Sequence, residues 1–113
     1  MLHPKLASYF CGMRFQTPVV LLSGCVGFGQ EYTRVEGFSH RDIGAVCLKG
    51  TTLSARPGNP THRVYETPSG MLNAIGLQNP GANKVVDEIL PSLNFQETRF
   101  IANVSGSTIE EYT

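Results

Sequence analysis

The chain has 113 residues, of which nine are basic, nine are acidic and 41% are hydrophobic, the composition of one ordinary soluble globular segment. Its zero net charge removes the electrostatic reason to expect nucleic acid as a partner. The longest apolar run, PVVLL at 18–22, is far shorter than the roughly 20 residues that cross a bilayer, and no signal-peptide pattern opens the chain, so the sequence predicts a cytoplasmic protein.

The first expected element is a small hairpin within residues 1–17, because two alternating pieces flank Gly12 in PKLASYFCGMRFQT. We expect this leading hairpin to lie over one end of a sheet. No linker or low-complexity stretch divides the chain. We therefore assign residues 18–113, the first strands and helices, to the same single domain.

Three short runs are expected to be buried strands: TPVVLLSG at 17–24, IGAVCLKGTT at 43–52 and RFIANVSGS at 99–107. Each is apolar and then abruptly polar. Continuous apolar runs without alternation are typical of strands covered on both faces, which indicates a parallel sheet with helices outside it.

Between the second and third runs, residues 79–95 carry a helical stripe, and Pro91 is expected to end or kink that helix. The stripe consists of Val85, Val86, Ile89, Leu90 and Leu93. Residues 29–44 are a weaker and shorter helical candidate, broken at Gly37. The order strand, helix, strand, helix, strand predicts the α/β class.

The connection from 53 to 80 is long for a compact domain, which favours a functional role. Its last part, MLNAIGLQNPG at 71–81, fits neither a strand nor a helix by its pattern. The carboxamides of Asn73, Gln78 and Asn79 both donate and accept hydrogen bonds, so they match the N–H and C=O edge of a cyclic imide or ureide. The alternative is a turn-rich loop that simply leads into the next helix.

At the C-terminus, Ser107 with Glu110 and Thr108 with Glu111 have capping-box spacing, which predicts the start of a helix. The sequence stops within about two turns of that start, too short for a stable helix. We therefore expect a chain cut within its fold; the alternative is a frayed natural tail.

The candidate ligand residues follow the three strands, since parallel α/β folds bind ligands at the carboxyl ends of strands. These residues are Ser23-Gly24, Lys49-Gly50-Thr51-Thr52 and Asn103-Val104-Ser105-Gly106. Lys49 is the most informative, because a cation at the end of a buried strand calls for an anionic partner, such as a reduced flavin or a substrate carboxylate. A structural salt bridge to a glutamate is the alternative for Lys49, and the ordinary polarity of loops is the alternative for the whole set.

The cysteines and one glycine-rich stretch argue against a metal site, a disulfide framework and a dinucleotide-binding motif. Cys11, Cys25 and Cys47 are odd in number and lack metal-ligand spacing, so we expect incidental thiols in a reducing compartment. GCVGFG at 24–29 does not have the spacing of a dinucleotide-binding fingerprint.

Several stretches together resemble one family, dihydroorotate dehydrogenase of class 1B. They are SGCVGFGQEY at 23–32, KGTT at 49–52, RPGNPTHRVYETPSGMLNAIGLQNPG at 56–81 and IANVSGST at 101–108. The resemblance implies the N-terminal part of a TIM (β/α)8 barrel, with about three of its strands. It also implies an FMN-dependent oxidation of dihydroorotate to orotate in pyrimidine biosynthesis.

The resemblance further implies roles for individual residues. Ser23, Lys49, Gly50 and Asn103 would contact FMN, although many class members have Ala at the position of Gly50. Lys49 with Asn73, Ala74, Ile75, Gly76 and Leu77 would hold the substrate. The family's catalytic base, a cysteine after the fourth strand, would lie beyond Thr113, so no catalytic residue is nominated and residues 1–113 alone are expected to be inactive.

NAIGLQNPG and KGTT are similar to the NAD-linked class. That similarity implies a homodimer of catalytic subunits within a heterotetramer, whose other subunit carries FAD and an iron–sulfur cluster. Two alternatives stay open from the sequence: a related flavin enzyme such as dihydropyrimidine dehydrogenase, and a non-catalytic remnant of the barrel.

Overall fold

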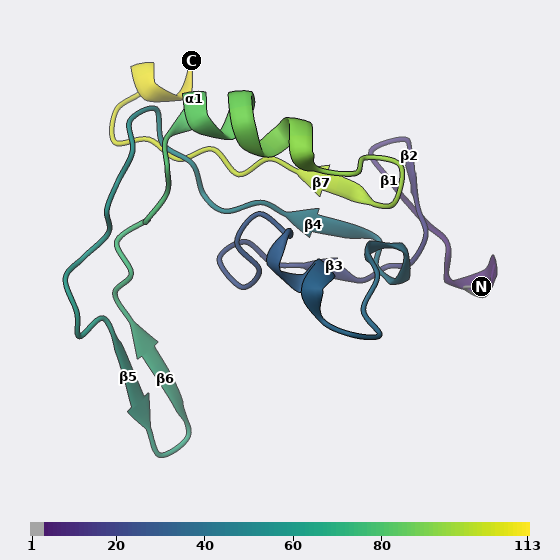
Figure 1. Ribbon diagram of the computed structural model, residues 1–113, viewed down its shortest axis with the longest axis horizontal. Coiled ribbons are helices and arrows are strands. Elements are labelled where there is room, and N and C mark those ends of the chain that lie inside the picture. The colour runs from purple at the N-terminus through teal and green to yellow at the C-terminus, as the bar shows by residue number, and fades with distance from the viewer. Residues whose placement is uncertain (1–3) are drawn as a thin grey trace.

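The computed structural model describes residues 4–113, so the first three residues of the range expected to hold the leading hairpin lie outside it. Its centre is a three-stranded parallel sheet (Figure 1). In spatial order its strands are β3 (Val20–Leu21), β4 (Ala45–Cys47) and β7 (Arg99–Ile101). The three predicted strands and their parallel arrangement are confirmed, although each regular strand is shorter than its apolar run.

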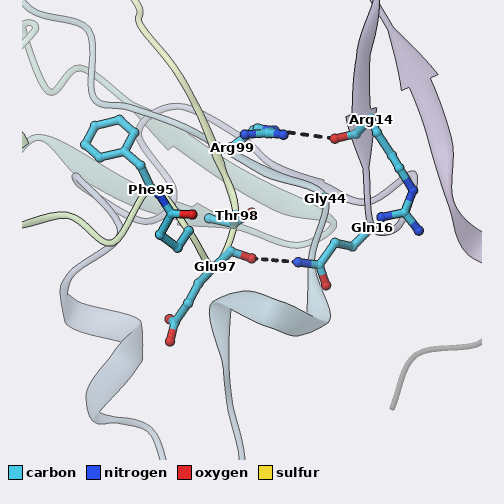
Figure 2. Close-up of a pocket in the computed structure, with 8 residues that line it drawn as sticks. Arg14, Gln16, Gly44, Phe95, Glu97, Thr98 and Arg99 are labelled. Carbon is cyan, nitrogen blue, oxygen red and sulfur yellow. Dashed lines mark hydrogen bonds between the residues drawn. The ribbon is translucent and has the colours of Figure 1, made fainter.

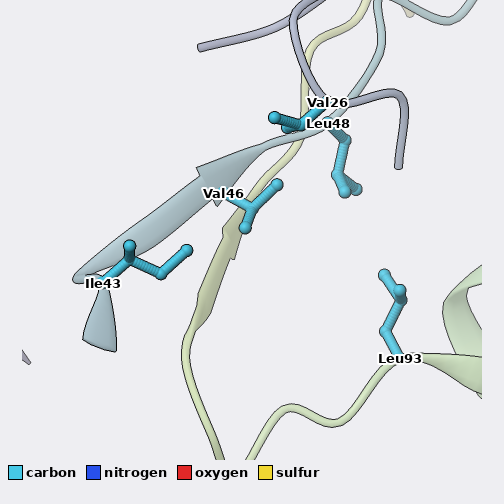
Figure 3. Packing of buried hydrophobic residues seen from close by; sticks show 5 residues of the cluster. All are labelled: Val26, Ile43, Val46, Leu48 and Leu93. Carbon is cyan, nitrogen blue, oxygen red and sulfur yellow. The ribbon is translucent and has the colours of Figure 1, made fainter. Parts of the chain in front are cut away.

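The hydrophobic core lies around the central strand β4, where Val46 is completely buried. Figure 3 shows the buried cluster, which consists of Val26, Ile43, Val46, Leu48 and Leu93. Leu21 and Phe100 from the flanking strands pack against it. Burial of β4 explains its continuous apolar pattern, because a strand between two neighbours with covered faces has no position for polar side chains.

The predicted helix within 79–95 is present as one helical segment alongside β7 (Figure 1). It begins as α1 (Ala82–Lys84), widens into a π-helical turn (Val85–Ile89) and ends in a 3₁₀ turn (Leu90–Ser92). From the apolar stripe, Val85 and Leu93 are buried, whereas Val86 stays 58% exposed. The segment ends just after Pro91, as its sequence predicted.

The weaker helical prediction, over residues 29–44, is wrong as an α-helix. The segment forms two 3₁₀ turns, Glu31–Arg34 and His40–Asp42, separated by Gly37 at φ +81°. The buried ring of His40 makes edge contacts with Phe38 and Phe100, and its Nε2 lies 2.9 Å from the Gly29 carbonyl oxygen. Packing of these rings onto the sheet, rather than helix propensity, decides the path of the chain here.

The predicted leading hairpin is present, preceded by a 3₁₀ turn (Pro4–Leu6). Strand β1 (Ser8–Phe10) pairs antiparallel with β2 (Met13–Phe15). The two residues between them, Cys11 and Gly12, both have positive φ, the conformation that suits the twist of a two-residue hairpin turn.

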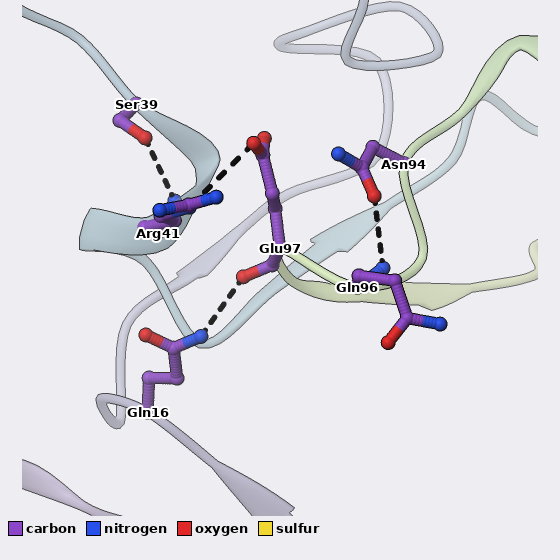
Figure 4. Close-up of polar contacts among 6 residues, drawn as sticks. All are labelled: Gln16, Ser39, Arg41, Asn94, Gln96 and Glu97. Atoms are coloured by element: carbon purple, nitrogen blue, oxygen red, sulfur yellow. Dashed lines mark hydrogen bonds and ion pairs between the residues drawn. The ribbon is translucent and has the colours of Figure 1, made fainter.

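The hairpin is joined to the amino-terminal ends of the strands by polar contacts. Gln16 Nε2 donates to the Glu97 carbonyl oxygen (3.0 Å), and Arg99 Nε donates to the Arg14 carbonyl oxygen (3.4 Å) across a pocket of about 190 Å³ (Figure 2). The Glu97 carboxylate also pairs with Arg41 at 3.6 Å (Figure 4). This pocket therefore lies between structural contacts, at the edge of the sheet opposite the strand ends predicted to bind a ligand.

Gly44, just before β4, allows a close approach of two chain segments. Its N–H donates to the Val19 carbonyl oxygen (2.9 Å), and a Cβ on Gly44 would overlap the Thr17 carbonyl oxygen. Gly44→Ala is therefore expected to lower the free energy of unfolding by about 3 kcal/mol, measured by urea titration. Gly70→Ala is the control, because its Cβ would meet nothing closer than 3.8 Å. Equal stability of the two variants would contradict this packing.

The long connection contains a second hairpin that the sequence analysis did not predict. Strands β5 (Val64–Thr67) and β6 (Gly70–Asn73) pair antiparallel and project away from the sheet (Figure 1). The expectation that 71–81 holds no strand is therefore wrong for residues 71–73. The turn residues Pro68 and Ser69, between Thr67 and Gly70, were the sequence signal for it.

The C-terminal residues form a 3₁₀ turn (Glu110–Tyr112), but the capping pairs are not the predicted ones. The Ser107 N–H donates to the Glu111 carboxylate instead of pairing with Glu110. The backbone N–H of Glu110 and, second, the Thr108 hydroxyl hold the pKa of the Glu110 carboxyl below its ordinary value. Across residues 4–113, no helix is long and apolar enough to span a membrane.

Candidate ligand site at the strand ends

The polar residues after the three strands lie at one edge of the sheet because the strands are parallel. Asn103, after β7, donates from Nδ2 to Ser23 Oγ, after β3, at 2.7 Å. This hydrogen bond joins the ends of the two outer strands past the end of β4. The bond also fixes the amide of Asn103 with its Nδ2 toward Ser23.

Gly50 lies buried between these side chains. A Cβ on Gly50 would lie 3.3 Å from Ser105 Oγ, 3.5 Å from Asn103 Nδ2 and 3.5 Å from Leu77 Cδ2. The Thr51 N–H donates to the Asn103 carbonyl oxygen (2.9 Å), so this part of the chain is held against the end of β7. Gly50 is therefore enclosed by hydroxyl, amide and apolar side chains, and it lines neither of the two cavities that Lys49 borders.

Lys49 is half-buried, and its Nζ lies 3.6 Å from the place that a Cβ on Gly24 would occupy. Within residues 4–113, its ammonium group has no ion pair with a carboxylate, so the structural salt bridge considered from the sequence is not formed. Burial without a paired carboxylate favours an anionic ligand at this position.

Lys49 borders a cleft of about 540 Å³ that opens beside the strand ends. The cleft is lined by Gly24, Gly27, Phe28, Glu31, Lys49, Arg56, Gln78, Asn79 and Pro80. Two cationic side chains and one carboxylate thus share one cavity with a carboxamide-bearing segment. This combination can bind an anionic or strongly polar ring compound.

The predicted substrate segment, Asn73–Leu77, runs from the end of β6 toward this edge. Leu77 reaches Gly50, while Asn73 pairs with Val64 at the base of the projecting hairpin. The cleft beside Lys49 is lined by Gln78 and Asn79 rather than by any residue of 73–77. The structure therefore brings Leu77 to the strand ends but does not place Asn73, Ala74, Ile75 or Gly76 in the cleft of Lys49.

The sequence analysis missed two charged residues of the cleft, Glu31 and Arg56. Arg56 is brought there by a backbone bridge with Asn79, in which each N–H donates to the other residue's carbonyl oxygen, at 2.9 and 3.0 Å. No local pattern signals a pairing across 23 positions. The sequence signal that could have indicated Arg56 was its position at the start of the RPGNP stretch, residues 56–60.

The three cysteines are free, and Cys25 is exposed in the loop that follows β3. None of the three lines the cleft.

These features define an α/β chain with a candidate polar ligand site at the carboxyl ends of a parallel sheet. The chain belongs to the dihydroorotate dehydrogenase family, whose family model matches residues 5–113.

Curated relatives carry the name dihydroorotate dehydrogenase B (NAD(+)), catalytic subunit. The protein of Anoxybacillus flavithermus is 54% identical over 108 residues, which is 96% of this chain and 34% of that protein. The protein of Bacillus caldolyticus is 52% identical with the same coverage, and that of Enterococcus faecalis is 47% identical over 99% of this chain and 36% of its own length. The chain thus spans about a third of the length of these relatives.

Two solved structures share the fold at low sequence identity. The Eimeria tenella DHODH in complex with ferulenol matches with a TM-score of 0.70 and 17% identity, over 98% of this chain and 32% of that chain. The ligand-free enzyme from the same organism matches with a TM-score of 0.66 and 19% identity, over 96% of this chain and 33% of that one. The curated relatives, all named as dihydroorotate dehydrogenase, do not favour the alternative of a dihydropyrimidine dehydrogenase.

Proposed function

We propose that the protein containing this chain is the catalytic subunit of an NAD-linked dihydroorotate dehydrogenase, which oxidises dihydroorotate to orotate in pyrimidine biosynthesis. The names of relatives up to 54% identical support this proposal. The structural observation that carries it is the convergence of Ser23, Gly50 and Asn103 at one edge of the sheet. Lys49 lies beside them and has no carboxylate partner within residues 4–113.

The polar groups at the strand ends fit FMN: the Ser23 hydroxyl and the Asn103 amide can hydrogen-bond a flavin ring, and the half-buried Lys49 ammonium can face its anionic edge. In this proposal Ser23, Lys49, Gly50 and Asn103 hold the flavin. Bound FMN supplies the acceptor for the hydride that leaves dihydroorotate. The Lys49 ammonium stabilises negative charge on the ring, and the hydrogen bond from Asn103 to Ser23 keeps both side chains in place.

The substrate is a cyclic imide that carries a carboxylate. Lys49 offers it a cation, and residues Asn73–Leu77 offer backbone and carboxamide groups that both donate and accept. Leu77, in contact distance of the Gly50 position, supplies an apolar surface next to the flavin site. We nominate no proton-accepting base among residues 1–113.

We further infer that β3, β4 and β7 are the first strands of an eight-stranded (β/α)8 barrel. The relatives' designation as a catalytic subunit supports a separate partner subunit. Our proposed assembly is a homodimer of catalytic subunits in a heterotetramer with a subunit that carries FAD and an iron–sulfur cluster.

The test is anaerobic mixing of the purified protein containing this chain with dihydroorotate while its visible flavin band is followed. We expect the band to bleach with dihydroorotate and to stay unchanged with dihydrouracil. Bleaching by dihydrouracil alone would favour a dihydropyrimidine dehydrogenase. A protein that retains flavin but responds to neither compound would contradict the proposed function.

A further inference from the structure

The backbone of the proposed substrate segment is held from one side by Asn59. The Asn59 backbone N–H donates to the Ile75 carbonyl oxygen at 3.0 Å, and its side-chain Nδ2 donates to the Ala74 carbonyl oxygen at 2.8 Å. One residue therefore binds two consecutive peptide groups of the segment.

Two glycines, Gly58 and Gly76, allow the chain to pack closely around these bonds. A Cβ on Gly76, which has φ +77°, would lie 2.8 Å from the backbone N and from Cγ of Asn59. A Cβ on Gly58 would lie 2.6 Å from the Ile75 carbonyl oxygen. The two glycines permit a close approach that sets the position of the segment against Asn59.

Asn59 is itself fixed by Arg63, at the start of the projecting hairpin. Arg63 Nη1 donates to the Asn59 carbonyl oxygen (3.2 Å), and Nη2 donates to Gln78 Oε1 (2.6 Å). The Ala74 N–H donates to the Arg63 carbonyl oxygen (2.8 Å). Asn59 thus belongs to a network that spans both ends of the segment.

The orientation of these peptide groups has a chemical consequence. In a trans peptide the N–H points opposite to the carbonyl, so the N–H groups of Ile75 and Gly76 are directed away from Asn59. Within residues 4–113 neither of these N–H groups donates to another protein group. Two neighbouring free donors suit the carboxylate or imide oxygens of a bound pyrimidine.

We propose that Asn59 is a positioning residue for substrate binding, which turns the N–H groups of Ile75 and Gly76 toward the pyrimidine. The proposal rests on the proposed function. Asn59 does not touch the flavin residues Ser23, Lys49, Gly50 or Asn103 through any hydrogen bond of the described chain. Its effect therefore falls on the substrate and not on the cofactor.

The decisive variant is Asn59→Asp, which keeps the size of the side chain and the backbone bond to Ile75. Its carboxylate cannot donate to the Ala74 carbonyl oxygen and repels it. We expect KM for dihydroorotate to rise about tenfold, kcat to change by less than about threefold and flavin content to stay unchanged. Because Asn59 is exposed, the variant is expected to fold.

The matched control is Asn94→Asp, another exposed position, whose Oδ1 accepts from the Gln96 N–H (3.1 Å; Figure 4). Aspartate preserves that acceptor, so KM is expected to be unchanged. If the wild-type protein does not oxidise dihydroorotate, the proposed function fails. If the wild-type protein turns over and Asn59→Asp keeps its KM, or loses flavin or thermal stability without a change in KM, the role of Asn59 is overturned.

Discussion

Lys49→Met is expected to lower kcat/KM for dihydroorotate by about a thousandfold, the loss typical of removing a group that stabilises developing charge. Methionine keeps the length and apolar stem of the side chain but removes the ammonium group. That group lies half-buried at the end of β4 and has no protein carboxylate as its partner within residues 4–113. The measurement is the rate of anaerobic flavin reduction at several dihydroorotate concentrations.

Lys84→Met is the control for this substitution. Lys84 is an exposed lysine on the helical segment. Its Nζ lies 3.7 Å from Glu88 Oε2, and both side chains of this ion pair are exposed to solvent. Such surface pairs contribute little, so the control is expected to keep wild-type activity. Lys49→Arg distinguishes the effect of the charge from the effect of the shape, because arginine keeps the positive charge but replaces the compact ammonium group with a planar guanidinium. Activity of Lys49→Met within about tenfold of wild type would contradict the proposed role.

Asn79→Ala is expected to lower the free energy of unfolding by about 4 kcal/mol, because it leaves several buried groups without partners. Asn79 Oδ1 accepts from the N–H groups of Thr52 (3.2 Å) and Gly81 (2.9 Å). Its Nδ2 donates to Thr52 Oγ1 (2.9 Å) and to the Leu77 carbonyl oxygen (2.8 Å). The single carboxamide thereby joins the long connection to the end of β4 and to the start of the helical segment.

The control for Asn79 is Thr98→Val, which removes one buried hydroxyl. Thr98 Oγ1 makes a single hydrogen bond, to the Ile43 carbonyl oxygen at 3.3 Å. Its loss is expected to cost about 1 kcal/mol. Urea unfolding of both variants measures the difference, and an Asn79→Ala variant no less stable than Thr98→Val would refute the network.

The parallel sheet could be predicted because its three apolar runs are continuous, and each run ends in small or polar residues. The residues after those runs, such as Lys49 and Asn103, could be placed at one edge because parallel strands end together. The helix ending near Pro91 could be predicted from its stripe and its proline. In each of these elements, the local pattern and the tertiary fold favour the same structure.

The errors arose where contacts distant in sequence decide the structure. Residues 29–44 form 3₁₀ turns because His40 packs against Phe100, 60 positions later in the chain. The hairpin of β5 and β6 was missed because prolines surround it and Met71–Asn73 alternates too briefly to be recognised alone. Arg56 enters the cleft only through its backbone pairing with Asn79. The flavin and substrate roles of the site residues stay predictions.

The most direct measurement is a crystal structure of the protein containing this chain with FMN and orotate bound. We predict that the flavin ring lies against Gly50, with Lys49 Nζ and the Ser23–Asn103 pair within hydrogen-bonding distance of its polar edge, and that orotate contacts the N–H groups of Ile75 and Gly76. A flavin bound elsewhere, or a Lys49 side chain directed into solvent away from both ligands, would contradict the account.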